Sequence, residues 1–124
     1  GVLSQRLVRR VCDACAQAAH LSPAELHALS IPATHGGLGL DRVQRGAGCP
    51  RCRGTGYRGR SGVFELMAGS EELQRLIMER APTPRLRRFA TEQGMRTLRE
   101  AAVSKLLQGI TTFDEVLRVT ADLR

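Results

Sequence analysis

The sequence predicts a mainly α-helical protein, in which a small subdomain stapled by four cysteines and containing a short β element precedes a compact bundle of short helices. Three observations lead to this fold class. The hydrophobic fraction is 42% but the aromatic fraction is only 3%, which is typical of helices packed through small aliphatic side chains. Two CxxC pairs lie within the first 52 residues. From residue 70 onward, apolar residues at helical spacing alternate with capping residues, proline and glycine.

The length and hydropathy of the chain limit its class. A chain of 124 residues has room for one domain, or for two small ones that share a modest core. No apolar run approaches the roughly 18 residues needed to span a bilayer, and no signal peptide opens the sequence. We therefore expect a cytoplasmic protein.

The net charge of +7 is concentrated in the first half of the chain. Residues 1–60 hold nine arginines and three acidic residues, a net charge of +6, whereas residues 61–124 hold ten basic and nine acidic residues, a net charge of +1. An uneven charge distribution of this kind bears on which partners the protein binds, and it does not indicate a particular fold. Proteins that bind nucleic acid usually place aromatic side chains among the basic ones, and Tyr57 is the only aromatic residue in the basic half. We therefore expect no nucleic-acid partner.

The four cysteines predict a structural zinc site. Cys12 and Cys15 form one CxxC pair, Cys49 and Cys52 form the other, and 33 residues separate the pairs. Two tight turns of this kind supply the tetrahedral sulfur cage that zinc favours. In a cytoplasmic chain, this arrangement favours a metal over disulfides, and two pairs favour it over a thioredoxin-type redox motif.

Because all four positions are sulfur, no position remains for water or substrate, which marks the site as structural. Arginines beside the pairs could offset the formal charge of −2 on such a centre, and the amides around Gly48 and Gly54 could donate to sulfur. The histidines at 20, 27 and 35 lie between the pairs, but four thiolates need no further ligand.

Two nucleotide-binding motifs are excluded. Gly54, Gly56 and Gly59 match GxGxxG, but that fingerprint requires a strand before it and a helix after it. A P-loop requires a lysine followed by Ser or Thr, and Leu106 follows the single lysine, Lys105. The stretch "CPRCRGTG" also matches one copy of the CxxCxGxG repeat of DnaJ-type chaperones, which carry four copies. No catalytic or nucleotide-binding residue is therefore predicted in this chain.

The apolar pattern divides the chain into three segments. Residues 1–11 carry apolar side chains at helical spacing and predict a helix. Residues 12–60 form the tetracysteine subdomain, which includes a helix capped by Ser22, with Pro23 and Glu25 completing the signal. Residues 61–124 form the helical subdomain, after a short strand candidate, "GVFELM".

Four short helices are predicted in the C-terminal segment. They begin at or after Ser70, Thr83, Thr97 and Thr112, and Gly94 and Gly109 end the second and third. The acidic residues of this segment fall on first turns and solvent faces, where they favour the positive end of a helix dipole. None of them indicates catalysis.

Four stretches together resemble one family. "LSQRLVRRVCDAC", "GCPRCRGTGYRGRSGVFELM", "GMRTLRE" and "GITTFDEVLRVT" look like the C-terminal end of the ATPases of type II secretion and type IV pilus assembly, over essentially the whole chain. "SQRLVR" and "EVLRVT" favour the secretion branch, and the pilus branch stays open. Alternatives from another class are a zinc-ribbon nucleic-acid-binding protein and a DnaJ-like chaperone module.

The resemblance implies a role in a larger machine. Cys12, Cys15, Cys49 and Cys52 match the family's zinc ligands, and the 1–11 helix would pack on a nucleotide-binding core that lies upstream, together with the sites for ATP and Mg. The intact protein would be an ATPase that powers protein transport, a homo-oligomeric ring docked to inner-membrane secretion components at the cytoplasmic face. An anionic lipid surface is a further expected partner of the basic half.

Overall fold

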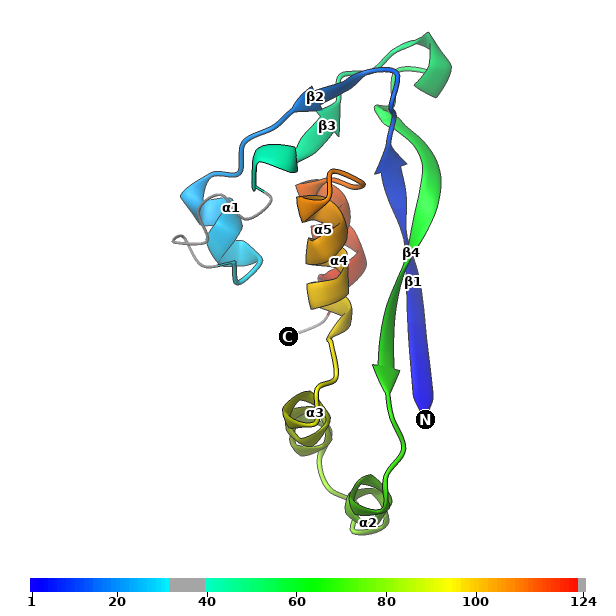
Figure 1. The fold of residues 1–124 in the computed structure, drawn as a ribbon, viewed down its shortest axis with the longest axis vertical. Helices are drawn as coiled ribbons and strands as arrows, with labels where there is room; N and C mark the ends of the chain where they lie inside the picture. The colour runs from blue at the N-terminus through cyan, green and yellow to red at the C-terminus, as the bar shows by residue number, and fades with distance from the viewer. Residues whose placement is uncertain (32–39, 123–124) are drawn as a thin grey trace.

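A long β-ribbon runs along one side of the molecule in the computed structural model, which describes residues 1–31 and 40–122 (Figure 1). The ribbon consists of β1 (Val2–Val11) and β4 (Tyr57–Met67), which pair antiparallel. Helices α4 (Leu98–Leu107) and α5 (Phe113–Thr120) pack against it. One end carries α2 (Glu71–Met78) and α3 (Thr83–Glu92), and the other carries the short pair β2 (Ala16–Ala18) and β3 (Gln44–Gly46). The remaining elements are α1 (Pro23–Ala28) and two short 3-10 turns, η1 (Leu40–Arg42) and η2 (Pro50–Cys52).

The predicted helix over residues 1–11 is wrong, because this segment is the strand β1. Its apolar residues follow a helical period, and in the strand they divide between the two faces of the ribbon. In the ribbon, Val8 is buried while Leu3 and Leu7 are exposed on the opposite face. The strand that supplies the backbone hydrogen-bond partners of β1 lies about fifty residues further along the sequence. The spacing of apolar residues within 1–11 carries no information about that strand. Strand pairing therefore overrides the helical pattern.

The strand candidate at "GVFELM" is confirmed, but β4 begins five residues earlier, at Tyr57. The strand therefore crosses the predicted boundary between residues 60 and 61. Its pairing with β1 is regular from Val2 opposite Met67 to Arg9 opposite Arg60, and then shifts before Val11 pairs with Tyr57. This bulge turns the end of the ribbon toward the cysteines.

The predicted helices are present with the expected starts. Ser22 caps α1 in a complete capping box, with the Glu25 amide 3.2 Å from the Ser22 hydroxyl and the Ser22 amide 2.9 Å from the Glu25 carboxylate. Ser70, Thr97 and Thr112 cap α2, α4 and α5. The four C-terminal helices do not form one bundle, however. They pack as two pairs, α2 on α3 and α4 on α5.

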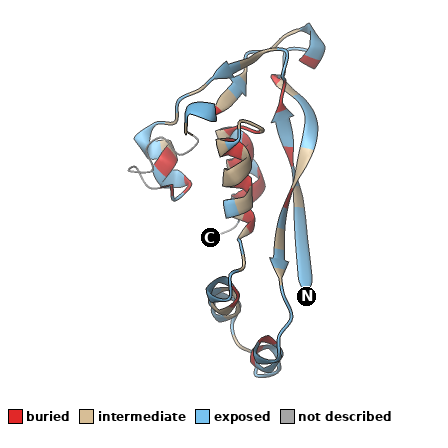
Figure 2. Cartoon of the chain, in the orientation of Figure 1, coloured by how far each residue is buried: buried red, intermediate tan, exposed pale blue. Residues whose placement is uncertain are grey.

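The hydrophobic core lies between the inner face of the ribbon, α4, α5 and α1, where buried positions gather (Figure 2). Hydrogen bonds also hold the two helices against the ribbon. The Glu65 carboxylate of β4 accepts from the Leu98 amide at the start of α4, at 2.7 Å. Arg6 of β1 donates to the Val119 carbonyl and to the Asp122 carboxylate at the end of α5. The core comprises Val8, Leu26, Leu29, Ile31, Val43, Val63, Leu98, Ala102, Leu106, Val116 and Val119.

Glu115 is a buried carboxylate that joins α5 to β1. Its side chain is 1% exposed, and both oxygens accept several hydrogen bonds. The Arg9 amide donates at 2.8 Å and the Arg9 guanidinium at 2.9 and 3.1 Å, while Arg118 donates twice at 2.8 Å. The Arg9 guanidinium also lies 4.0 Å above the centre of the Tyr57 ring. The acidic residues of this segment were expected on first turns and solvent faces; Glu115 is in the first turn of α5, but the expectation of a solvent face is wrong for it.

This network holds Glu115 ionised. Burial raises the pKa of the carboxyl, but the hydrogen bonds from Arg118 and Arg9 outweigh it and lower the pKa from 4.5 to about 2. A lowered pKa in the folded state stabilises the fold above the ordinary pKa, and that stabilisation disappears as the pH falls toward the folded-state value. The ionised network therefore contributes about 3 kcal/mol at neutral pH.

We predict that Glu115→Gln lowers the free energy of unfolding at pH 7 by about 3 kcal/mol, because the two arginines lose their anion in a buried setting. Wild-type protein should lose a similar amount between about pH 4.5 and pH 2, and the variant should lose much less there. Urea unfolding across this pH range measures both effects. Asp114→Asn is the matched control, since Asp114 is exposed in the same helical turn. A Glu115→Gln variant as stable as the control would contradict the assignment.

Candidate metal centre

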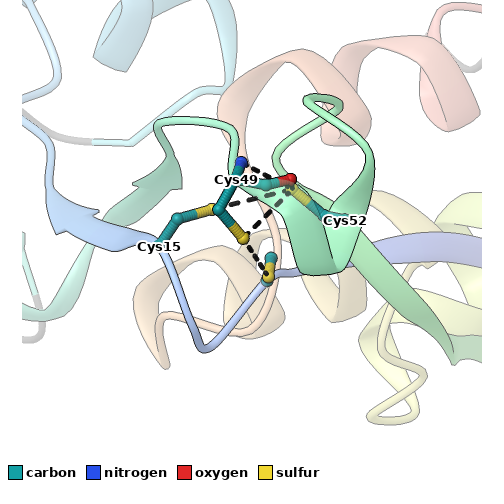
Figure 3. Close-up of side chains that lie close together, drawn as sticks. Cys15, Cys49 and Cys52 are labelled. Atoms are coloured by element: carbon teal, nitrogen blue, oxygen red, sulfur yellow. Dashed lines mark hydrogen bonds between the residues drawn. The ribbon is translucent and has the colours of Figure 1, made fainter.

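The four cysteines come together at the end of the β-ribbon. Cys12 follows β1 directly, and Cys15 precedes β2. Cys49 precedes the 3-10 turn η2, and Cys52 is its last residue. Figure 3 shows the sulfur atoms of Cys15, Cys49 and Cys52 converging from two separate chain segments. The two predicted CxxC pairs therefore meet in space as the sequence predicts.

The sulfur geometry fits a tetrahedral metal ion. The sulfur of Cys12 lies 3.8 Å from that of Cys49, Cys15 lies 3.8 Å from Cys52, and Cys49 lies 3.7 Å from Cys52. All four sulfurs lie within 4.8 Å of one another. A tetrahedron with metal–sulfur bonds of about 2.3 Å has edges of about 3.8 Å. The same separations are too long for a disulfide bond, and all four cysteines are free.

Backbone amides converge on two of the sulfurs. The Gly48 amide donates to the sulfur of Cys15 at 3.3 Å. The amides of Cys49 and Gly56 each donate to the sulfur of Cys52 at 3.2 Å. The expected donor at Gly48 is confirmed, whereas the Gly54 amide instead donates to the Cys49 carbonyl at 2.9 Å. Such donors stabilise thiolate ligands and fix their orientation.

These surroundings shift the pKa values of the Cys15 and Cys52 thiols in opposite directions. Burial raises the pKa of the Cys15 thiol to about 12, and the Gly48 amide opposes that shift only in part. Burial also opposes ionisation of Cys52, but hydrogen bonds from the amides of Cys49 and Gly56 and from the side chains of Cys49 and Cys15 outweigh it and lower the pKa of that thiol to about 6. The surroundings of Cys52 therefore favour the thiolate, which is the form that binds metal.

Glycine is required where the chain before the second cysteine turn meets the chain after it, at Gly46 and Gly56. A Cβ atom at Gly46 would lie 2.1 Å from the carbonyl oxygen of Gly56, closer than any real contact. Gly56 itself has a φ of +81°, in the left-handed region. Gly56 also donates to Cys52 and accepts from the Cys12 amide at 2.9 Å. This role of Gly56 was not predicted, although its position four residues after Cys52 was a visible signal.

The other predicted neighbours of the site are distributed differently. Arg10, Arg51 and Arg53 are exposed, while Arg9 is held by Glu115. Among the described residues, the only group of side chains arranged to hold a metal is the set of four cysteines. His20 and His27 are outside that group, and His35 lies outside the described residues. A metal with four sulfur ligands has no open position, so the site suits a structural role.

Comparisons with known proteins identify the family of the chain over nearly all of its length. Residues 1–118 match the family described as type II/IV secretion system protein. The chain is 41% identical over 122 residues to the type IV pilus assembly ATPase PilB of Thermus thermophilus. It is 39% identical over 124 residues to type II secretion system protein E of Xanthomonas campestris, and 38% identical over 122 residues to type II secretion system protein HxcR of Pseudomonas aeruginosa.

Each of these alignments covers 98% of this chain. The chain in turn spans only 14%, 21% and 22% of the length of the three relatives, in the order given. The match favours the secretion family over a zinc-ribbon nucleic-acid-binding protein or a DnaJ-like module. It includes both branches of the family that the sequence motifs indicated.

We predict that the purified chain carries one metal ion, zinc by ligand type, and that Cys49→Ser abolishes stoichiometric binding. Metal binding in small modules of this kind contributes roughly 10–16 kcal/mol, so the variant should also unfold at a much lower temperature. Elemental analysis and thermal unfolding measure the two effects. Arg51→Ser is the control, because Arg51 is exposed between Cys49 and Cys52. Absence of metal from wild-type protein, or unchanged stability in Cys49→Ser, would contradict a structural site.

Proposed function

Because the chain belongs to the type II/IV secretion system protein family, we propose that it is the C-terminal zinc-binding and helical portion of an ATPase that powers type II protein secretion through pseudopilus assembly. The observation that carries the proposal is the similarity over 98% of the chain to type II secretion proteins and to a pilus assembly ATPase. The chain spans about a fifth of the secretion relatives, so the ATP and Mg site is assigned to the remainder of the protein.

The metal role rests on the geometry of the cysteines. Cys12, Cys15, Cys49 and Cys52 bind zinc in this proposal, since four sulfurs at tetrahedral spacing match the coordination that zinc prefers. Zinc would join the two ends of the segment between the pairs. The residues of the chain supply the thiolates and the amides that orient them, and no catalytic step is assigned here.

The outer face of the β-ribbon supports a position against a nucleotide-binding core. Leu3 pairs with Leu66, and Phe64 pairs with Gln5 on the same face. Leu3 is 62% exposed, Leu66 is 58% exposed and Phe64 is 49% exposed. A two-stranded ribbon with an exposed apolar face is seldom stable without further cover. We assign that cover to the nucleotide-binding core of the same protein, which corrects the expected packing element from a helix to a strand.

A second candidate is the ATPase of a type IV pilus system. The observation in its favour is the 41% identity to a type IV pilus assembly ATPase. Deletion of the gene in the source organism separates the two candidates. Loss of protein secretion with surface pili retained supports the secretion role, whereas loss of pili with secretion retained transfers the assignment to pilus assembly.

The proposed partners follow from the family. The intact protein would form a homo-oligomeric ring and dock to inner-membrane components of the secretion system at the cytoplasmic face. Among residues 1–31 and 40–122, none of the helices has the length and hydropathy of a membrane span. In this proposal the protein attaches to the membrane peripherally, through the partners and through basic side chains.

The basic side chains near the cysteines support attraction to an anionic surface. Arg10, Arg45, Arg51 and Arg53 are exposed around the tetracysteine cluster, as are Arg58 and Arg60 on β4. Each basic group near an anionic bilayer contributes about 1 kcal/mol of attraction, and salt screens that attraction. The set as a whole therefore suits a weak, salt-dependent contact with anionic lipid headgroups.

We predict that the purified 124-residue chain does not hydrolyse ATP, because its single lysine is followed by Leu106 and no phosphate-cradling loop precedes a helix. A longer protein that includes the upstream segment should hydrolyse ATP with Mg. Phosphate release from both proteins, purified in parallel, measures the difference. Metal-dependent turnover by the 124-residue chain alone would overturn the assignment of the ATP site.

We also predict that the chain binds vesicles containing anionic lipid more strongly than neutral vesicles, and that moderate salt abolishes the difference. Arg45→Ala with Arg51→Ala should weaken this binding roughly thirtyfold, since two charges that contribute about 1 kcal/mol each are lost. Co-sedimentation at low and moderate salt measures the effect. Arg85→Ala with Arg88→Ala, exposed on α3, is the charge-matched control. Equal binding to both vesicle types would leave these arginines as a solvated surface.

A further inference from the structure

The segment between the two cysteine pairs shares its core with the last two helices. Leu26, Leu29, Ile31 and Val43 come from this segment, and they belong to one cluster of buried residues with side chains of α4 and α5. Leu106, near the end of α4, and Val116, in the middle of α5, are fully buried. The boundary expected at residues 60 and 61 therefore passes through a single hydrophobic core. Neither side of the boundary can bury its apolar residues alone.

Hydrogen bonds join the cysteine turns to the start of α5. The Val11 amide, next to Cys12, donates to the Ile110 carbonyl at 2.8 Å. The Thr111 hydroxyl donates to the Arg9 carbonyl at 2.8 Å. The Tyr57 hydroxyl lies 2.7 Å from that of Thr112, the N-cap of α5. Arg9 and Val11 at the end of β1, and Tyr57 next to Gly56, are thus bonded to the three residues that precede α5.

The ends of the helices are joined in the same way. The Arg99 guanidinium donates to the Ala28 carbonyl, the last residue of α1, at 3.4 Å and to the Thr120 carbonyl, the last residue of α5, at 3.0 Å. One side chain of α4 therefore holds a helix of the segment between the cysteine pairs beside the C-terminal helix. The contact adds to the shared core rather than replacing it.

The α2–α3 hairpin differs from these elements. Its buried residues Leu73, Leu76 and Ala90 lie outside the main core cluster, and the two helices pack chiefly on each other. Segments without helix or strand connect the hairpin to β4 and to α4, as Figure 1 shows at one end of the ribbon. The hairpin thus lies within the predicted helical subdomain but apart from its core.

We propose that the metal centre, the β-ribbon, α1, α4 and α5 fold as one cooperative unit, while the α2–α3 hairpin folds as a separate one. Binding of metal by the four cysteines then controls the order of α4 and α5, which lie outside the tetracysteine segment. This inference rests on the proposed metal site and concerns which residues that site stabilises. It replaces the expectation of two subdomains that divide near residue 60.

Coupling of this kind is reciprocal. If metal binding is required to order α4 and α5, then loosening their core must weaken metal binding by the same free energy. A change in the hairpin should leave metal affinity unaffected, because its buried residues lie outside the shared core. The two directions of coupling can be measured independently.

The first experiment removes zinc from the full chain with a chelator and follows amide hydrogen exchange by residue. Protection of the Val116 and Leu106 amides is expected to fall at least about a hundredfold, together with that of residues beside the cysteines, because these amides open with the unit. Protection of the Leu76 and Ala90 amides is expected to change less than about threefold. Retained protection in α4 and α5, or equal loss in the hairpin, would overturn the proposal.

The second experiment measures zinc affinity by competition with a chromophoric chelator. Leu106→Ala is expected to weaken zinc binding at least about tenfold, and Val116→Ala, a smaller truncation, at least about threefold. Leu73→Ala in α2 is the matched control and should stay within about twofold of wild type. Val116→Ala keeps the test valid if Leu106→Ala does not fold. Equal affinity in all three variants would overturn the proposal, whereas wild-type protein that binds no zinc would overturn the metal site itself and the inference with it.

Discussion

The antiparallel pairing of β1 with β4 is the constraint on which the rest of the structure depends. These strands lie about fifty residues apart in the sequence, and their register fixes three things at once. It brings Cys12 and Cys52 to the same end of the ribbon. It presents Val8 and Val63 on one face, where α4 and α5 cover them. It also places Leu3 beside Leu66 on the other face, where the described part of the chain leaves them exposed.

Two groups of ionisable side chains lie near this end of the ribbon, the carboxylate of Glu115 and the four cysteines. At Glu115, a single carboxylate is kept ionised by two arginines and an amide, so the charge is compensated inside the protein. At the cysteines, amides donate to the sulfurs of Cys15 and Cys52, and in the proposed centre a cation compensates the four thiolates. Arg9 is bonded to Glu115 and stacked on Tyr57, the residue after Gly56. The charge of Glu115 is thus balanced by side chains of the protein, whereas that of the cysteines is balanced by the proposed metal.

The features that the sequence predicted are those encoded within a few residues. Ser22 with Glu25, and Ser70, Thr97 and Thr112, cap helices through contacts three residues away, so the helix starts are visible locally. The cysteine spacing belongs to the same category, because each turn is local and only the meeting of the two turns is not. The strand β1 and the role of Glu115 depend on partners about fifty and one hundred residues away. Apolar periodicity does not specify such partners. For the same reason, the sequence did not predict that α1, α4 and α5 share one hydrophobic core.

The α2–α3 hairpin lies at the opposite end of the β-ribbon from the four cysteines. A paired strand of ten residues extends about 33 Å at a rise of about 3.3 Å per residue. The metal centre lies at one end of that length and the hairpin at the other (Figure 1). A tilt of about 10° at the base of such a ribbon moves its tip by about 6 Å, by the geometry of a rigid rod of that length. The hairpin is therefore the described element that a small tilt about the cysteine end of the ribbon would displace most.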